Sequence, residues 1–341
     1  MKRIKKKMSI KKKIVIIFSS LFVIGIASFL FLLYGPYAGF REWLITTAMS
    51  TMNHQYLATW FYSQETIDEV LAKHTTIEPD FNTDTSLINE EESYDYIDEY
   101  DKEILDRPKD SLYKYIKLDE DGFDAYLVAI YDPSKISVVT SKYLGTRGQY
   151  LVDMARENDA VVAINGGGFR DTGGQGDGGS PVGIIIEDGE IVNTSRYTVS
   201  GGIIGFTNDN KLFLGKVSAE EAIANGVRDA VEFGPFLIVN GESSFINGNG
   251  GYGVHPRTAI GQRKDGIVLF LVVDGRRIDS MGADMNDLTD IMLRYHAYNA
   301  ANLDGGNSSV LVIDNEIVNR PLNWDNLEQT RPIASGFIVT E

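Results

Sequence analysis

From about Leu112 to the C-terminus, the chain consists of short apolar runs separated by Gly, Asn and Asp residues. Runs of this length, bounded by residues that favour turns, are typical of β-strands. Asp188-Gly189 and Asp265-Gly266 each lie between two apolar runs, and Asp-Gly is a strong signal for a tight β-hairpin. The predicted strands and hairpins lie at 123–131 with 135–140, 160–165, 182–192, 202–215, 231–242, 258–275, 311–318 and 332–340.

Helical spacing of apolar residues is rare in the same region. Asp284 and Asp287 have the spacing of a capping box, which begins a helix. Thr146 and Gln149 have the same spacing, and Gly226 is placed to end a helix. Many hairpins with few helices predict an α+β fold built on a mainly antiparallel sheet. The predicted helices lie at 146–157, 218–226 and 285–298.

The first residues of the chain follow a different pattern. Residues 14–34 form a run of 21 residues without a charge, and about 20 apolar residues span a bilayer as a helix. Eight Lys and Arg residues precede the run, within 2–13, and basic residues favour the cytoplasmic side. We therefore expect a single-pass signal anchor in the cell membrane, with the chain after Tyr34 outside the cell. A cleaved signal peptide is the alternative, although its apolar part spans only about 7–15 residues.

The region between the predicted span and the predicted strands divides into two parts. Residues 35–76 are expected to form a juxtamembrane helical segment, with the aromatic residues 60–62 packed in a core. Packing of these aromatic residues on a second copy of the chain or at the membrane is the alternative. Residues 77–111 are expected to form an acidic linker, because 78–106 carry twelve acidic residues against one basic residue. Such a segment repels itself and buries little apolar surface. We therefore expect residues 112–341 to fold alone as the C-terminal domain.

Composition excludes several kinds of chemistry. The 341 residues contain no cysteine, which excludes disulfides, iron–sulfur clusters, Cys-ligated zinc and thiol nucleophiles. Four scattered histidines disfavour a His-rich metal site. The net charge is −16, and the eight basic residues of the N-terminal tail leave −24 on the rest of the chain. An outer domain this acidic disfavours nucleic acid as a partner. An exported protein without cysteine suits a bacterium that does not depend on disulfides.

Glycine-rich turns are the candidate positions for a site, because glycine lets backbone approach a ligand closely. Asp304 lies in one of them, where a carboxylate can act as a base, a nucleophile or a metal ligand. Asp171 and Asp177 lie in another, where oxygen ligands would suit a divalent cation and a bare flexible loop is an equal alternative. No dinucleotide-binding fingerprint, Walker A loop or nucleophile elbow is present. The three turns are 165–168, 171–179 and 304–306.

Two arginines precede predicted strands, Arg257 before 258–275 and Arg331 before the last strand. The guanidinium fork matches the oxygens of phosphate or carboxylate. Taken singly, each is better explained as a surface arginine. Whether either arginine binds a ligand therefore depends on the residues that surround it.

Five stretches, in this order, resemble the phosphodiester glycosidase family, which has lysosomal members and bacterial members of the exopolysaccharide-biosynthesis type. The similarity covers roughly residues 120–341 and leaves out the segments before them. Because the chain has no cysteine, the disulfides of the lysosomal members do not carry over. The stretches are NGGGF (165–169), GPFLIVNGE (234–242), PRTAIG (256–261), VVDGR (272–276) and NLDGGNSSV (302–310).

The resemblance implies particular site residues. The family's Asn-Gly-Gly-aromatic-Phe element falls on 165–169, its Arg-Thr-Ala-Ile-Gly element on 257–261, and its Asp-Gly-Gly-Gly-Ser element on 304–308. Two residues depart from the family's pattern, because Gly168 replaces an aromatic residue and Asn307 replaces a glycine. Both departures would change the shape of the substrate pocket that the resemblance implies. The substrate-binding residues implied are Arg257, Arg331, Gly166, Gly167, Gly305, Gly306 and Ser308.

The activity implied is hydrolysis of a sugar-1-phosphodiester, such as one of N-acetylglucosamine, in a cell-surface polysaccharide or teichoic-acid-type polymer. A phosphate leaving group is a stable anion, and it needs cationic stabilisation that Arg257 and Arg331 would supply. A carboxylate near the anomeric carbon would activate water or stabilise an oxocarbenium-like state. Asp304 is the first candidate and Glu232 the second, and Asn165 is expected to orient a sugar hydroxyl or acetamido group.

No cofactor is assigned, apart from the divalent cation that Asp171 and Asp177 would bind. The expected partners are a carbohydrate phosphodiester or surface polysaccharide and, through residues 14–34, the membrane. Two alternatives stay open because a fold does not determine a function. One is a non-catalytic factor that binds or assembles exopolysaccharide. The other is a metal-dependent phosphodiesterase that cleaves the P–O bond.

Overall fold

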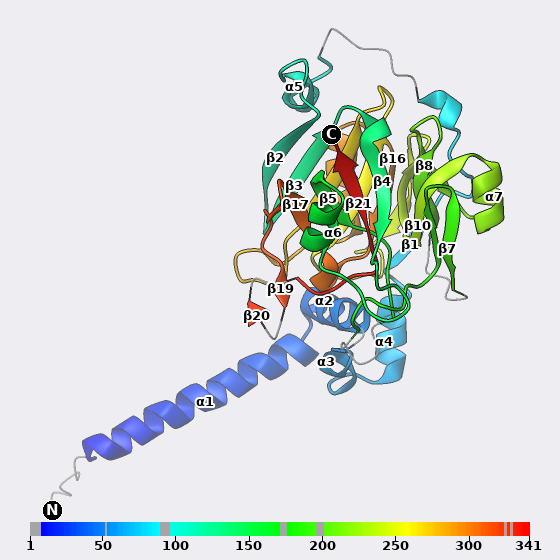
Figure 1. Ribbon diagram of the computed structural model, residues 1–341. Coiled ribbons are helices and arrows are strands. Elements are labelled where there is room, and N and C mark those ends of the chain that lie inside the picture. Colours follow the sequence, from blue (N-terminus) through cyan, green and yellow to red (C-terminus); the bar gives the residue numbers. More distant parts are fainter. Residues whose placement is uncertain are drawn as a thin grey trace, which may run out of the picture.

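The computed structural model describes residues 8–51, 53–88, 96–170, 176–195, 201–323, 326–327 and 330–341. Its strands form three large sheets in which every pair of neighbours is antiparallel, and this confirms the predicted α+β fold. Figure 1 shows the sheets gathered into one domain, with a long helix projecting away from it. Two pairs of short strands complete the described sheets, β1 (Thr75–Ile77) with β13 (Phe245–Asn247) and β19 (Leu322–Asn323) with β20 (Asn326–Leu327).

The largest sheet has seven strands, and the other two have five each. The seven-stranded sheet has the order β12 (Glu242–Ser243), β11 (Phe236–Val239), β16 (Ala297–Leu303), β14 (Arg257–Arg263), β15 (Val268–Val273), β3 (Phe123–Ile130) and β2 (Tyr113–Glu120). The second has the order β18 (Glu316–Ile317), β17 (Leu311–Ile313), β5 (Ala160–Asn165), β21 (Ser335–Thr340) and β4 (Ile136–Thr140). The third has the order β7 (Glu190–Thr194), β6 (Ile184–Glu187), β10 (Val227–Phe233), β8 (Gly202–Thr207) and β9 (Leu212–Gly215).

The main core lies between the three sheets. Phe270 of β15, Phe337 of β21 and Phe206 of β8 come from different sheets and are all fully buried. The ring of Phe337 lies 6.5 Å from that of Phe270 and 6.2 Å from that of Phe206, measured between centroids. A buried phenylalanine replaced by alanine typically costs about 3–5 kcal/mol. These rings therefore contribute strongly to holding the sheets in fixed relation.

Short helices cover the outer faces of the sheets. α8 (Met285–Arg294) and α5 (Glu99–Leu105) contribute to a second core on the other face of the seven-stranded sheet. α6 (Leu151–Glu157) packs on the β5–β21 sheet, and α7 (Ala219–Ala224) packs on the β6–β10 sheet. α8 begins with the predicted capping box of Asp284 and Asp287.

One predicted hairpin is wrong. β3 pairs with β2 and β15, whereas β4 pairs with β21 in a different sheet. The reason is local, because Asp132 accepts a hydrogen bond from the Ser134 backbone nitrogen (3.0 Å) at the start of a 3-10 turn. The chain therefore leaves the first sheet at Asp132-Pro133 instead of folding back along β3. The Asp-Gly hairpins β6–β7 and β14–β15 are confirmed.

Two helix boundaries also differ from the prediction. α8 ends at Arg294, and residues 297–303 form strand β16, in the middle of the largest sheet. α6 begins at Leu151 without a side-chain cap. Gln149 donates instead to Glu157 (Nε2 to Oε2, 2.9 Å), so the capping box expected from Thr146 and Gln149 does not form.

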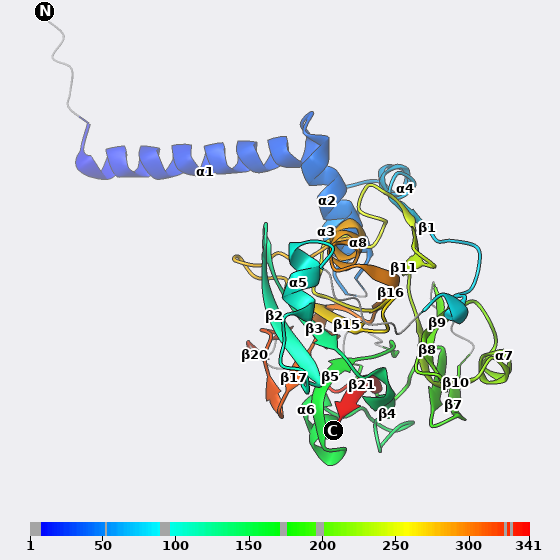
Figure 2. The same cartoon turned by 90° about the horizontal axis from the view of Figure 1, so that it is seen from above.

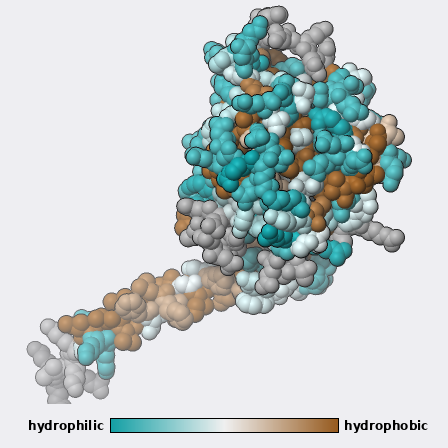
Figure 3. Space-filling model, viewed as in Figure 1, coloured by the Kyte–Doolittle hydropathy of each residue, from teal (hydrophilic) through white to brown (hydrophobic). Residues whose placement is uncertain are grey.

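The N-terminal part contains a projecting helix and a helical cap. α1 (Ile10–Tyr34) is the only described helix that is long and apolar enough to cross a membrane. In Figure 3 it is an apolar rod beside a domain whose visible surface is mostly hydrophilic. The cap, defined as residues 38–74 without Met52, contains α2 (Ala38–Met49), α3 (Tyr56–Thr59) and α4 (Gln64–Leu71). It lies between α1 and the sheets in two views (Figures 1 and 2).

The expected solvated linker at 77–111 does not agree with its described residues. Thr83 forms backbone and side-chain hydrogen bonds with Leu214 of β9. Asp101 is 1% exposed and forms an ion pair with buried Arg263 (2.5 Å), and Ile104 is fully buried beneath the seven-stranded sheet. The segment therefore belongs to the fold on both sides of 89–95, which lie outside the described residues. Its acidity misled the prediction because several acids have partners distant in the sequence.

These contacts predict that a fragment 112–341 is less stable than a fragment 39–341. Removing Asp101 leaves the Arg263 guanidinium with one fewer carboxylate in a buried site, and breaking a buried ion pair on one side typically costs about 3–5 kcal/mol. Urea unfolding of both fragments measures the difference in the free energy of unfolding.

Single substitutions in the longer fragment test the cause of that difference. Asp101→Asn should reproduce part of the loss. Asp106→Asn, on an exposed residue of the same segment, should not. Equal unfolding midpoints for the two fragments would show that residues 112–341 form an autonomous domain after all.

Candidate functional site

The candidate site lies where strands of two sheets end together. Because β14 is antiparallel to both neighbours, Arg257 at its start faces Val273 at the end of β15, and Thr258 faces Leu303 at the end of β16. Asp304 follows directly after Leu303. The turn that follows β5 reaches the same place, because the Asp304 backbone nitrogen donates to the Gly166 carbonyl (3.1 Å). The fold therefore brings together four of the five stretches on which the family resemblance depends.

Asn165 joins these strands through its side-chain amide. Its Nδ2 donates to the Asp304 carbonyl (2.6 Å), and its Oδ1 accepts from Thr258 Oγ1 (2.7 Å) and from the Val310 nitrogen (3.1 Å). The residue is 1% exposed. Both ends of the amide are thus engaged by protein, so the geometry supports a positioning role. The expected contact of Asn165 with a sugar is not supported.

The glycines of the site allow close approach between chain segments. A Cβ on Gly166 would lie 2.9 Å from Ser335 Oγ, one on Gly167 3.2 Å from Val231 Cβ, and one on Gly305 2.9 Å from the Pro256 carbonyl oxygen. Gly306 has a φ of +64°, and a Cβ there would lie 3.1 Å from Nη2 of Arg276. The first three positions are therefore explained by packing within the protein, whereas Gly306 borders a charged group.

Arg276 is the site residue that the sequence reasoning missed. It ends the VVDGR stretch in a left-handed conformation (φ 61°), and its Nη1 donates to Asn307 Oδ1 (2.6 Å). Burial, with a smaller contribution from the charge of Arg331, lowers the pKa of Arg276 to about 10. Among the described residues, no carboxylate contributes to this shift. The signal was a basic residue directly after an Asp-Gly pair at the end of a buried strand.

Arg331 contacts the same turn at the next residue. Its Nε donates to Ser308 Oγ (3.1 Å), and its guanidinium lies 4.5 Å from the centre of the Phe169 ring. Arg276 and Arg331 therefore flank the 3-10 turn Gly306–Ser308 that follows Asp304. Two cations held near each other in a partly buried place repel, and an anion between them relieves the repulsion. The arrangement suits a phosphate group.

Arg257 has a different role from the one expected. Its Nη2 donates to the carbonyls of Tyr252 (2.6 Å) and Gly253 (2.8 Å), and its Nε donates to Ala283 (3.3 Å). Burial lowers the pKa of Arg257 to about 10, against the opposing charge of Asp284. These hydrogen bonds of the guanidinium are all to backbone carbonyls of the turns beside the site. The geometry therefore assigns Arg257 to positioning.

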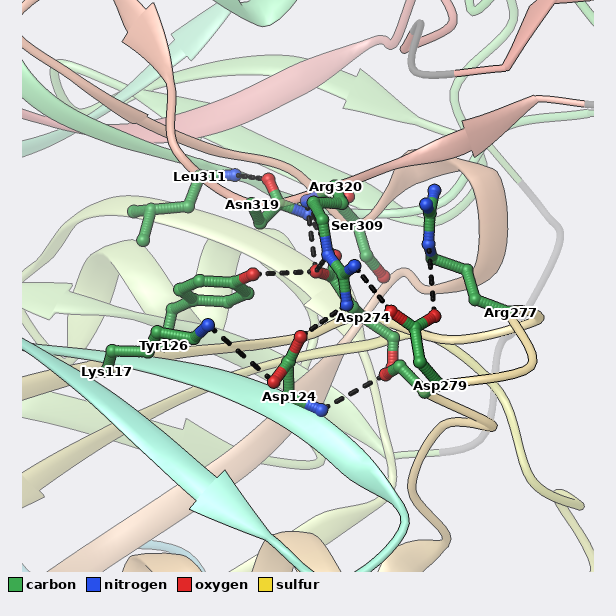
Figure 4. Close-up of polar contacts among 11 residues, drawn as sticks. Lys117, Asp124, Tyr126, Asp274, Arg277, Asp279, Ser309, Leu311, Asn319 and Arg320 are labelled. Carbon is green, nitrogen blue, oxygen red and sulfur yellow. Dashed lines mark hydrogen bonds and ion pairs between the residues drawn. The ribbon is translucent and has the colours of Figure 1, made fainter.

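A network of charged and polar groups holds the chain around Ser309, directly after the turn that the two arginines contact (Figure 4). Asp274, the acid of VVDGR, is 1% exposed and accepts hydrogen bonds from Tyr126 Oη (2.8 Å), Asn319 Nδ2 (3.0 Å) and the Arg320 nitrogen (2.9 Å). Asn319 also donates to the Ser309 carbonyl (3.2 Å), which follows the turn between the two arginines. Asp274 thus fixes one end of that turn. Burial, then the charge of Asp274, raises the pKa of Tyr126, which keeps its hydroxyl a donor.

Arg320 balances the acids of this network. Its guanidinium forms ion pairs with Asp124, with Asp279 (2.7 Å) and with Asp274 (3.5 Å). Hydrogen bonding to Asp279 is the main reason why the pKa of Arg320 is raised. Each of these three acids therefore has a cationic partner, and Lys117 and Arg277 add positive charge beside Asp124 and Asp279.

Glu232, the second candidate carboxylate, lies near the turn that follows β5. Its carbonyl would be 3.4 Å from a Cβ on Gly167, and its Oε2 accepts from the Ile184 nitrogen (2.9 Å). Burial raises the pKa of Glu232, and the hydrogen bond from Ile184 opposes the shift. The raised pKa shifts the balance of this carboxyl toward its protonated form.

The predicted cation ligands are not brought into a metal cluster by the described residues. Asp177 Oδ1 accepts from the Gly179 nitrogen (3.0 Å), and its carbonyl accepts from the Gly148 nitrogen (2.5 Å). Asp171 lies outside the described residues. Across the part of the chain that is described, no group of three His, Asp or Glu side chains could hold a metal ion. A cation at Asp171 and Asp177 stays a prediction.

Comparison with known proteins agrees with this arrangement. A model of the phosphodiester glycosidase family matches residues 158–340, which is more than half of the chain. The SPbeta prophage-derived protein YomE of Bacillus subtilis is 31% identical over 198 residues, covering 55% of this chain and 30% of YomE. Human N-acetylglucosamine-1-phosphodiester alpha-N-acetylglucosaminidase is 28% identical over 191 residues, covering 50% of this chain and 35% of the human protein.

A solved structure shows the same fold. The catalytic domain of zebrafish N-acetylglucosamine-1-phosphodiester alpha-N-acetylglucosaminidase, auto-inhibited by its pro-peptide, superposes with a TM-score of 0.56 at 21% identity. The superposition covers 69% of this chain and 85% of that domain. The chain itself spans about a third of the length of the curated relatives that it matches. On the family match, which covers the strands and turns of the site, this chain belongs to the phosphodiester glycosidase family.

Proposed function

We propose that the protein is a hydrolase that cleaves a sugar-1-phosphodiester, such as one of N-acetylglucosamine, at the anomeric C–O bond. One observation carries the proposal. Arg276 and Arg331 flank the turn that follows Asp304, so an anion-binding position lies next to a carboxylate. Family membership supports this assignment, and so do the activities for which the human and zebrafish relatives are named.

The proposed reaction uses these groups in a simple order. The arginines bind the phosphate oxygens, and their charge stabilises the phosphomonoester as it leaves with the electrons of the C–O bond. Water attacks the anomeric carbon, and a carboxylate takes one proton from it. Asp304 is our first candidate for that carboxylate and Glu232 the second. The products are a free sugar and a phosphomonoester.

The proposed location follows from α1. One apolar helix after a basic tail supports a single-pass anchor with the C-terminal domain outside the cell. The proposed substrate is then a surface polysaccharide or a teichoic-acid-type polymer. The alternatives, a non-catalytic assembly factor and a phosphodiesterase that cleaves P–O, are outcomes of the experiments below.

Asp304→Asn should lower kcat by about 100-fold or more, because general acid–base catalysis typically contributes a factor of that size or larger. The assay measures free N-acetylglucosamine released from its methyl phosphodiester. Asp209→Asn, on the exposed turn between β8 and β9, is the matched control and should retain activity. Unchanged turnover in Asp304→Asn would remove Asp304 from the mechanism. No product from the wild-type protein would favour the assembly factor.

Arg276→Ala should lower kcat/KM about 10- to 100-fold for the phosphodiester, because a hydrogen bond to a charged group is typically worth about 1.5–3 kcal/mol. An uncharged aryl glycoside of the same sugar should be affected much less. Arg277→Ala removes the same charge from the next residue and is the control.

The two substrates and labelled water separate the remaining mechanisms. An equal loss for both substrates in Arg276→Ala would show that this arginine does not contact phosphate. In isotopically labelled water, the label should enter the sugar. Label in the phosphate would identify cleavage of the P–O bond.

Glu232→Gln should change how stability depends on pH. A carboxyl whose pKa is higher in the folded protein contributes stability below its unfolded pKa, and this contribution is lost as pH rises through the folded pKa. Because the pKa of Glu232 is raised by burial, the free energy of unfolding of Glu232→Gln, relative to wild type, should increase from about pH 4 to about pH 7. Urea unfolding at both pH values measures it, with exposed Glu242→Gln as the control for losing one carboxyl. A difference that does not change with pH would contradict the buried environment.

A further inference from the structure

The outer end of α1 is packed against the helical cap. The ring of Phe61 meets that of Phe29 edge to face, with 5.7 Å between centroids. The Tyr34 hydroxyl donates to the Phe61 carbonyl (3.0 Å), and the Tyr62 hydroxyl donates to the Leu33 carbonyl (3.0 Å). Leu33 is 1% exposed because cap residues surround it. The cap is therefore fixed to the apolar helix itself and is more than a tether between helix and domain.

This attachment sets the height of the cap relative to a membrane. The uncharged run 14–34 has 21 residues, which makes a helix about 31 Å long and matches a hydrocarbon core about 30 Å thick. Phe29 lies five residues before Tyr34, which is about 7 Å along the helix axis. Phe61, whose ring centre is 5.7 Å from that of Phe29, would then lie just inside the boundary between hydrocarbon and water. The cap lies at that boundary with it.

The cap exposes apolar side chains next to this contact. Trp60 is 72% exposed, and its ring lies 4.8 Å from that of half-exposed Tyr56, centroid to centroid. Leu57 of the cap and Tyr37, just before the cap, are also exposed. The expected burial of the aromatic triplet 60–62 therefore holds for Tyr62 and fails for Trp60. Tryptophan and tyrosine are the residues enriched where a membrane protein meets the interface.

Other residues of the cap border the candidate site. Ser50 Oγ is hydrogen-bonded to His255 Nε2 (2.7 Å), and Thr47 Oγ1 accepts from the Val254 nitrogen (3.3 Å). His54 is close enough to Arg276 that the arginine charge, after burial, lowers its pKa. The rings of His54 and Tyr56 are 6.1 Å apart. One part of the cap thus borders the turn before Arg257 and also exposes Trp60.

We propose that residues Tyr37, Tyr56, Leu57 and Trp60 lie in the membrane–water interface and hold the Arg276–Arg331 site beside the bilayer, so that the substrate is a glycosyl phosphodiester carried on a lipid. This inference rests on the proposed function for the chemistry of the substrate. The proposed position of the cap in the membrane–water interface is argued from the contacts of the cap alone and does not depend on the proposed function. The phosphate of a lipid-linked substrate lies among the lipid headgroups. A site that borders a cap lying in the membrane–water interface would lie at the same depth.

Fluorescence quenching tests the docking. The full-length chain is reconstituted in phospholipid vesicles with Trp43→Phe and Trp324→Phe, so that Trp60 is the only tryptophan. Lipids brominated near the headgroup end of their acyl chains should quench Trp60 by at least twofold. The control places the only tryptophan at exposed Tyr96, just before α5, at the opposite end of the domain in Figure 1, and it should be unquenched. Equal quenching at both positions, or none at either, would overturn the proposal.

Turnover tests the substrate class. Two esters of N-acetylglucosamine 1-phosphate are compared in these vesicles, one with a long prenyl alcohol and one with methanol. Trp60→Ser with Leu57→Ser should lower turnover of the prenyl ester about tenfold and leave that of the methyl ester unchanged. Trp60→Tyr should restore the prenyl activity. An unchanged ratio of the two activities would overturn the proposal while leaving the proposed function standing. Failure of wild type on both esters would instead reject the proposed function.

Discussion

The side chain of Asn165 is the contact on which the candidate site depends. One amide joins the end of β5, the start of β14 and both ends of the 304–310 turn, and so it links two of the three sheets. Replacing it would leave a buried carbonyl and a buried backbone nitrogen unpaired, at about 1–3 kcal/mol each. The position of Asp304 is therefore set by a hydrogen-bonding constraint in the core. The same constraint explains why Asn165 itself is withdrawn from solvent.

Charge is distributed unevenly in this acidic protein. Arg263 and Arg320 lie among carboxylates and form ion pairs with them, and these pairs join segments of chain far apart in sequence. Arg276 instead forms a hydrogen bond with the side-chain amide of Asn307, and the charge of Arg331 contributes to lowering its pKa. Keeping positive charge in a partly buried place without a carboxylate costs free energy, and such a cost is commonly met where a ligand supplies the missing charge. The Asp274 network holds the intervening turn, so the arginines do not depend on each other for position.

The N-terminal third of the chain is structurally continuous with the site. β1 adds to the edge of β13, the acidic segment supplies Asp101 and Ile104 to the interior, and the cap contacts the turn before Arg257. A helix that ends in such contacts cannot turn freely relative to the domain. The orientation of the domain on a membrane would then be a property of the fold, which a flexible stalk could not provide.

The sequence alone determined the features that depend on neighbouring residues. Apolar length predicted α1, Asp-Gly pairs predicted the β6–β7 and β14–β15 hairpins, and Asp284 with Asp287 predicted the start of α8, because turns and caps are closed by residues a few positions apart. The family resemblance assigned Asp304 and Arg331 to one site, and Arg331 contacts the turn that follows Asp304. Only the tertiary structure decided that β3 and β4 enter different sheets, that Arg276 and not Arg257 faces the turn after Asp304, and that Asp101 is buried. In each of these cases the deciding partner lies far away in the sequence, and the residue's own type is compatible with either outcome.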